Sequence, residues 1–353
     1  PPADRDAALA LKAIDVSEAT GGTQGLVAAG GESPLVRALS YPDRAVRFRA
    51  AFALARANPA KPFADSFRVV PVLAAAISSA GSPTALVVGA DEDVRNHLAD
   101  ILRNGSSHYT VYTGPTLAAA LQQSRRAPAF DVIVIENGPE VAKISQLGQQ
   151  DYRLPGAPVL VAASEDNLPG VKAEVEENRG YGAISDKADE AALTAALATA
   201  QADSGTVPFD AQTAAQMAST SIKLLDTLSA DHASIYKVQD ALPTLTDALR
   251  DKRPDIATGA AGVLGHLNNP DAEKAIAAIA LAPDTDASLR TPMLMALAES
   301  AKRTGDALDS SAVNALIKEV STESDPQIQM AAATALGELN VPSNQASTLV
   351  LQQ

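Results

Sequence analysis

Short apolar runs separated by amphipathic stretches are the feature that most constrains the fold of this chain. Between residues 83 and 200 the runs are Ala85–Val88, Tyr109–Tyr112, Val132–Ile135, Pro158–Val161 and Gly182–Ser185. The segments between and after them, such as Asp93–Arg103, Leu117–Gln122 and Glu190–Ala200, have helical spacing. Strands that are apolar along most of their length are buried on both faces of a sheet. The pattern therefore predicts a five-stranded parallel sheet covered by helices, of the flavodoxin-like type.

Residues 211–340 have a different pattern, with no strand-like run and a repeated helix. Three similar helices begin at Ile256, Leu289 and Ile328, that is, 33 and 39 residues apart. Each follows a shorter helix and a polar turn; the shorter helices are Leu242–Leu249, Ala272–Leu281 and Ala312–Val320. Helix pairs that recur at such a period predict an α-solenoid.

Residues 35–55 belong to the same class. A helix at Leu35–Leu39 leads through a turn with Asp43 to a second helix that opens on Val46-Arg47 and contains the small pair Ala50-Ala51. This arrangement resembles a HEAT repeat. The later helices resemble HEAT repeats less closely: they keep the small pairs Ala260-Ala261 and Ala331-Ala332 and have Arg290 after Leu289, but Ala257 and Gln329 stand where the family often has a basic residue. The resemblance implies an incomplete ladder of that basic residue with the turn aspartate.

The order of these segments predicts an insertion. Phe67–Ser79 looks like the first helix of a repeat, but the sheet-forming segment follows it, and a suitable second helix comes only at Thr213–Leu228. Because insertions in solenoids fall in loops, we expect the α/β domain to lie between two helices of one repeat. The predicted domains are HEAT-like repeats at 1–80, an inserted α/β domain at 83–200, HEAT-like repeats at 211–340 and a tail at 341–353.

The α/β segment resembles the response-regulator receiver family over nearly all of residues 83–200. The residues that carry the resemblance are Leu86–Val88, Asp93-Val94-Arg95, Phe130–Ile135 and Pro158–Val161. Receivers are Mg²⁺-dependent self-phosphorylating domains. In that family, an acidic pair after the first strand and an acceptor aspartate after the third strand hold the metal. A Ser or Thr after the fourth strand and a Lys after the fifth contact the phosphoryl group.

This chain departs from the receiver pattern at almost all of these positions. The acidic pair falls on Gly89 and Ala90, the acceptor on Glu136, the hydroxyl on Ala163 with Ser164 one residue later, and only the lysine is kept, as Lys187. Glycine and alanine have no side-chain oxygen for Mg²⁺. A glutamate is a poor acceptor where the site is built for a shorter side chain, because small displacements are costly in catalysis. We therefore expect a degenerate receiver pocket that serves as an interaction surface.

Two alternatives remain open at this pocket. Asp91 and Glu92 lie two residues late, and a shift in register would give an atypical, phosphorylatable receiver that uses Mg²⁺ and acts as a signalling switch. Separately, Glu136 and Lys187 could form an ion pair that resembles a permanently set switch, or both could be solvated loop residues.

Composition excludes several other functions. The chain has no cysteine, which excludes disulfides, thiolate metal sites and a cysteine nucleophile. Its net charge of −14 disfavours binding to nucleic acid, and we interpret the cluster of Arg44, Arg47, Arg49 and Arg56 as a solvated helix face. Its four histidines, His97, His108, His232 and His266, have no metal-ligand spacing, and no apolar run reaches the roughly 18 residues of a membrane span.

We therefore predict a non-enzymatic protein–protein interaction scaffold or adaptor, with no cofactor and no metal, whose partner is another protein. A structural subunit of a larger assembly is the alternative closest to this prediction. The resemblance to receivers implies a bacterial signalling protein. The chain begins with Pro1, so we expect a piece of a longer protein. A cytoplasmic location is favoured, with a periplasmic one left open if a signal peptide was removed. The partner and the oligomeric state do not follow from the sequence.

Overall fold

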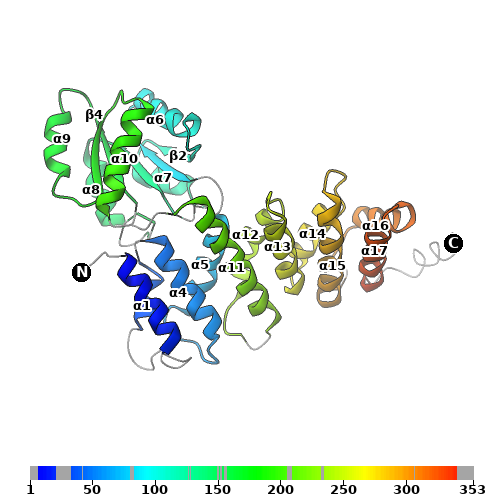
Figure 1. The fold of residues 1–353 in the computed structure, drawn as a ribbon. Helices are drawn as coiled ribbons and strands as arrows, with labels where there is room; N and C mark the ends of the chain where they lie inside the picture. Colours follow the sequence, from blue (N-terminus) through cyan, green and yellow to red (C-terminus); the bar gives the residue numbers. More distant parts are fainter. Residues whose placement is uncertain are drawn as a thin grey trace. The chain divides into compact units, whose positions relative to one another are not determined.

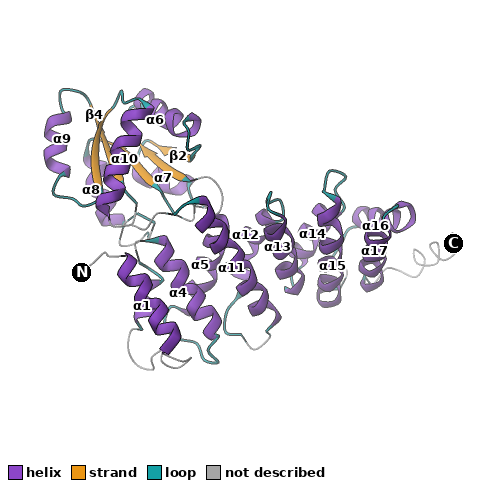
Figure 2. Cartoon of the chain, viewed as in Figure 1, coloured by secondary structure: helices purple, strands orange, loops and turns teal. Residues whose placement is uncertain are grey.

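The computed structural model describes residues 7–20, 33–41, 43–79, 83–125, 127, 129–148, 151, 153–154, 157–204, 209–231, 234–305 and 307–339. These residues are mostly helical, and they include a sheet of five strands (Figures 1 and 2). The chain divides into two compact units: residues 1–57 with 78–215, and residues 58–77 with 216–353. The tail predicted at 341–353 lies outside the described residues.

The sheet of the first unit is parallel throughout, as the sequence predicts. Its strands are β1 (Thr84–Val88), β2 (Thr110–Gly114), β3 (Val132–Glu136), β4 (Val159–Ala163) and β5 (Tyr181–Ser185), in the order β2-β1-β3-β4-β5. This is the strand order of flavodoxin-like folds, in which ligands bind beyond the carboxyl ends of the strands. The register pairs Val88 with Ile135 and Ala163 with Ser185, so β1, β3, β4 and β5 all end at one edge.

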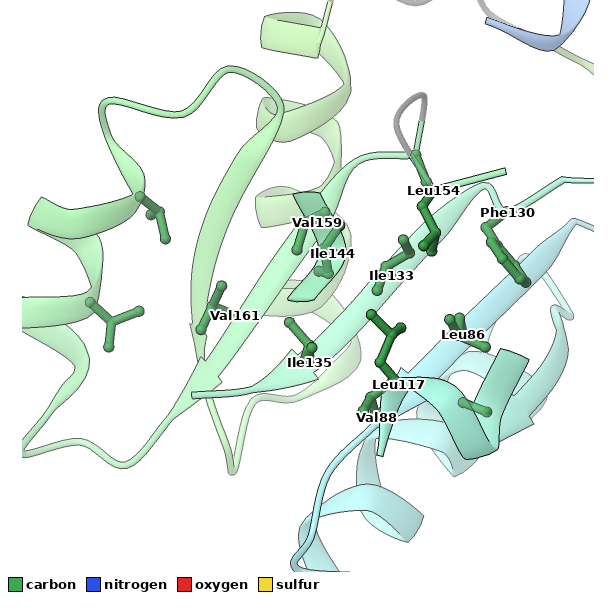
Figure 3. Close-up of a cluster of buried hydrophobic side chains, with 14 of the residues drawn as sticks. Leu86, Val88, Leu117, Phe130, Ile133, Ile135, Ile144, Leu154, Val159 and Val161 are labelled. Atoms are coloured by element: carbon green, nitrogen blue, oxygen red, sulfur yellow. The ribbon is translucent and has the colours of Figure 1, made fainter. Parts of the chain in front are cut away.

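Helices cover both faces of the sheet because successive strand residues point to opposite sides. The helices are α6 (Glu92–Asn104), α7 (Leu117–Gln123), α8 (Pro139–Leu147), α9 (Leu168–Val175) and α10 (Glu190–Ser204). One core joins alternate strand residues to α7, α8 and α9; its labelled members in Figure 3 are Leu86, Val88, Leu117, Phe130, Ile133, Ile135, Ile144, Leu154, Val159 and Val161. The other core joins the intervening strand residues to α6 and α10, which contribute Leu98, Leu102, Leu193 and Leu197.

The first unit also contains α1 (Ala7–Thr20), α3 (Pro34–Ala38) and α4 (Arg44–Ala57), with α4 packed against the other two. Two arginines of α4 do not belong to the solvated face predicted above. Arg47 is 2% exposed and donates from Nη1 to the carbonyl oxygen of Tyr41 at 2.7 Å. Arg44 is 15% exposed and pairs with Asp131. Arg49 and Arg56 are 33% and 43% exposed in their pairs with Asp15 and Glu18, so the interpretation was wrong for Arg44 and Arg47 only.

The second unit joins two segments that are far apart in the sequence. It contains most of α5 (Val69–Ser78), which follows the short 3₁₀ helix η1 (Ser66–Arg68), and most of α11 (Ala211–Ala230). The buried hydroxyl of Ser221 on α11 donates to the carbonyl oxygen of Leu73 on α5 at 2.6 Å. The Asn58 amide donates to the Asp231 carboxylate, also at 2.6 Å. The helix predicted before the α/β domain thus packs with the helix predicted after it.

The remaining helices of the second unit follow the predicted positions closely. After η2 (Val238–Ala241) they are α12 (Leu242–Ala248), α13 (Pro254–His266), α14 (Pro270–Ala280), α15 (Ala287–Thr304), α16 (Ser310–Thr322) and α17 (Pro326–Glu338). Helices α13, α15 and α17 pack in succession, and α14 and α16 pack against the helix that follows each. Arg290 on α15 binds Glu319 and Glu323 rather than a turn aspartate.

Membrane-spanning segments are absent among the helices that the structure describes, since none is both long enough and apolar enough.

Candidate functional site

The predicted site lies in the loops that follow β1, β3, β4 and β5. Glu136 and Ala163 are the last residues of β3 and β4, Gly89, Ala90 and Asp91 follow β1, and Lys187 follows β5 by two residues. Parallel strands place all these loops at the carboxyl edge of the sheet. The fold thus brings the positions named from the sequence to a single edge.

Glu136 and Gly89 are in close steric contact. The Glu136 carboxylate turns toward the loop after β1, where its Oε2 accepts the backbone N–H of Asp91 at 3.1 Å. A Cβ atom built on Gly89 would lie 3.0 Å from the same oxygen and 3.3 Å from the Glu136 Cβ. With Glu136 in this rotamer, a larger residue at 89 would require the glutamate side chain to shift by a few tenths of an ångström.

Two further hydrogen bonds hold the loop after β1. Gly89 donates its N–H to the carbonyl oxygen of Gly114 at 3.2 Å, and the Gly89 carbonyl accepts from Arg95 Nη1 at 2.5 Å. These two bonds use both backbone polar groups of Gly89, and Glu136 holds the N–H of Asp91 two residues later. This role of Arg95 could not be predicted from the sequence, because a bond between a helix residue and a loop leaves no periodic pattern.

Asp91 and Glu92, the residues of the register-shift alternative, lie at the start of α6. Asp91 is the N-cap: its Oδ1 accepts the N–H groups of Asp93 at 2.9 Å and Val94 at 3.2 Å. This cap satisfies two of the amides that a helix start leaves open. Metal binding by Asp91 would compete with these bonds. No group of three or more metal-ligating side chains occurs among the described residues.

The other predicted residues are apart from this contact. Ala163 is 4% exposed and its carbonyl accepts the N–H of Asp186 at 2.9 Å. Ser164 and Lys187 are exposed, and the Lys187 N–H donates to Ser185 Oγ at 3.2 Å. Over the described ranges, Lys187 forms no ion pair with Glu136. The carboxyl edge therefore consists of a hydrogen-bonded loop after β1 and exposed side chains. Among its described residues, no nucleophilic side chain is hydrogen-bonded to a side-chain base.

A second cluster resembles a catalytic triad in composition only. It joins Ser229 and Asp226 on α11 to His266 at the end of α13. His266 Nδ1 lies 3.1 Å from Ser229 Oγ and 3.3 Å from Asp226 Oδ1. A triad histidine uses its two ring nitrogens for two different partners, whereas here one nitrogen contacts both. His97, by contrast, uses Nε2 on the carbonyl of Ala188 at 3.0 Å, and His232 lies outside the described residues.

Comparisons with known proteins add little to this geometry. No protein-family model matches the sequence, and a search of curated proteins finds no match. Among solved structures, the chain is similar to a crystal structure of an engineered protein, with 17% sequence identity and a TM-score of 0.28 over 99% of this chain and 89% of that chain. A TM-score this low supports no statement about fold or function.

Proposed function

We propose that this chain is a non-enzymatic protein-interaction scaffold, in which a receiver-like α/β domain without phosphoacceptor chemistry is inserted into HEAT-like helical repeats. The contact of Glu136 with Gly89 and Asp91 carries the proposal. A phosphoryl group and its Mg²⁺ need open space and free oxygen ligands at this place. Glu136 uses its carboxylate on the backbone instead, and Asp91 uses its own to cap α6.

The packing of α5 with α11 supports the inserted arrangement. The buried bond from Ser221 to Leu73 joins helices on either side of the α/β domain in the sequence. Stacked helix pairs such as α12 to α17 offer extended surfaces to protein partners. Solenoids and receiver-like domains each serve many roles, so the residues at the carboxyl edge, and not the folds, carry the functional argument.

Phosphorylation chemistry tests the first half of the proposal. The chain should show no phosphoryl adduct by intact-mass spectrometry after incubation with acetyl phosphate and Mg²⁺, and no heat of Mg²⁺ binding by calorimetry. A quadruple variant, Gly89→Asp and Ala90→Asp with Glu136→Asp and Ala163→Thr, restores the receiver residue types and shortens the side chain that faces residue 89. Adduct formation by the unsubstituted chain, abolished by Asp91→Asn, would favour the phosphorylatable alternative.

Capture of a partner tests the second half. Asp166→Lys reverses a charge in the loop after β4, at the carboxyl edge, whereas Glu177→Lys makes the same change beyond the other end of α9; both side chains are exposed. Because charges at the rim of an interface steer association, the first variant should lose a partner that the unsubstituted chain and the second variant both retain, as measured by affinity capture with mass spectrometry. Equal capture by all three would place the partner surface elsewhere.

A further inference from the structure

A separate group of contacts lies at the amino edge of the sheet. Asp131 immediately precedes β3, and its Oδ2 accepts the backbone N–H of Thr84, the first residue of β1, at 2.8 Å. Its Oδ1 pairs with the guanidinium of Arg44, the first residue of α4. The ion pair therefore joins α4 to a residue that also binds the first residue of β1.

Phe209 brings the other end of the domain to the same place. It follows the last helix of the domain, α10, which ends at Ser204, and it stands just before α11. The guanidinium carbon of Arg44 lies 4.3 Å from the centre of the Phe209 ring. Phe48, one turn further along α4, meets this ring edge-on with centroids 5.8 Å apart. One arginine of α4 thus contacts Asp131, which is hydrogen-bonded to the first residue of β1, and Phe209, which follows the last helix of the α/β domain.

Arg44 is largely buried and charged, so its contacts depend on the exact positions of its partners. The side chains of Arg44 and Asp131 are 15% and 14% exposed. Burial, together with the nearby Arg47 cation, lowers the pKa of Arg44 to about 10, so the group stays charged near neutral pH. A charge removed from water is costly unless its partner remains in place. The flat guanidinium adds a geometric requirement, because it must pair with the carboxylate and lie over the ring at once.

We propose that Arg44 is a latch that holds the α/β domain in one orientation on α4, by binding at the same time Asp131, which is tied to the start of β1, and Phe209, which follows α10. With the latch in place, α1, α4 and the α/β domain move as one body. The proposal does not depend on the function proposed for the carboxyl edge.

Spin labels measure this directly, because the chain has no cysteine of its own. Lys12→Cys on α1 and Lys172→Cys on α9 place labels at exposed positions on the two sides of the latch. Electron–electron double resonance should give a narrow distance distribution for the otherwise unsubstituted chain. Arg44→Met should broaden it about twofold or more, since the buried carboxylate loses its partner. Arg103→Met is the control: Arg103 pairs with Asp100 on its own helix α6, away from the latch and from both labelled helices, so the distribution should stay narrow.

A broad distribution in the otherwise unsubstituted chain, or a narrow one in Arg44→Met, would overturn the proposal. If Arg44→Met fails to fold, as judged by circular dichroism, Phe209→Leu keeps an apolar side chain but removes the ring over which the guanidinium lies. That variant should broaden the distribution by a smaller factor, and an unchanged width would count against the latch.

Discussion

Gly89 and Glu136 show how two residues at one edge depend on each other. A Cβ atom at residue 89 would crowd the Glu136 oxygen that accepts the N–H of Asp91. Glycine suits this position because a side chain there would disturb that hydrogen bond. The pair therefore acts as one unit that fixes the loop after β1.

Gly89→Ala tests this dependence. We expect the variant to lower the free energy of unfolding by about 1 kcal/mol, because the new methyl group overpacks against Glu136. In a Glu136→Ala background the same change should cost nothing or should stabilise, since alanine restricts the unfolded chain more than glycine does. Urea denaturation of the four proteins of the double-mutant cycle gives the coupling. Additive effects would show that the contact does not matter energetically.

Two glycines of α13 give a second test at this scale. A Cβ on Gly259 would lie 2.2 Å from Cγ2 of the buried Ile222, whereas a Cβ on Gly262 would lie 3.6 Å from Asp226 Oδ1, an ordinary contact. Gly259→Ala should therefore destabilise by about 1–3 kcal/mol because the core is overpacked. Gly262→Ala should stabilise by about 0.5–1 kcal/mol, the helix propensity gained. Thermal unfolding of both variants distinguishes them, and a loss for both would show that this helix does not tolerate any added methyl group.

Residue roles were only partly predictable from the sequence. The positions that lack receiver chemistry, such as Gly89 and Glu136, followed from the order of strands. The hydrogen bond that Glu136 forms could not be predicted, because its partner is a backbone amide 45 residues away in the sequence. Arg44 and Arg47 were misread for the same reason: charge counted along a helix says nothing about a carboxylate or carbonyl brought to it by tertiary packing.

At the scale of elements, periodicity was most reliable where segments were long or fully apolar. The five strands and the helices α12 to α17 lie within a few residues of their predicted bounds, except that α15, predicted to end at Leu297, continues to Thr304. No pattern pointed to α1, and α8 and α9 were not located. Helix α8 buries only Ile144 among its nine residues, so it has no apolar stripe, and the first turn of α9 contains Pro169-Gly170, a pair that ordinarily marks a turn. Helices α8 and α9 are positioned by packing against the apolar face of the sheet.

The segment between α8 and β4 gives a prediction on pH. Arg153 donates from Nη2 to Asp151 Oδ2 at 2.6 Å and from Nη1 to the carbonyl oxygens of Ser124 and Ala127 at 2.5 and 3.1 Å. Burial acts to raise the pKa of Asp151, but the hydrogen bonds and charge of Arg153 outweigh it, so this pKa lies below its ordinary value. A lowered pKa in the folded state adds stability above the ordinary pKa of aspartate, and this stability is lost as the pH falls through the folded pKa.

We therefore expect the free energy of unfolding to fall as the pH is lowered from about 5 to about 3, with a smaller fall in Asp151→Asn. Urea denaturation across this range measures both slopes. Asp100→Asn is the control, because Asp100 is 63% exposed in its pair with Arg103 and should leave the slope nearly unchanged. An acid slope in Asp151→Asn equal to that of the unsubstituted chain would contradict the prediction.

At the scale of the whole chain, the insertion of the α/β domain is a prediction that contacts within the second unit support. Besides the bond from Ser221 to Leu73, the ring of Phe63 meets Tyr236 edge-on, with centroids 6.4 Å apart. Both contacts join residues that precede the α/β domain to residues that follow it. If the repeat is continuous across the insertion, these residues should stay together when the chain is cut.

A specific protease site placed between residues 205 and 208 tests this continuity. After cleavage, the two fragments should elute together in size-exclusion chromatography, because the segment 58–77 stays packed with residues after 216. Tyr236→Ala should weaken this association most, since Tyr236 is 6% exposed and truncating a buried aromatic side chain costs about 3–5 kcal/mol. Arg153→Met, which removes contacts within the α/β domain only, should weaken it less, as measured by the urea concentration at which the fragments separate. Fragments that separate without urea, or that respond more to Arg153→Met, would show that the two flanking segments do not form one repeat.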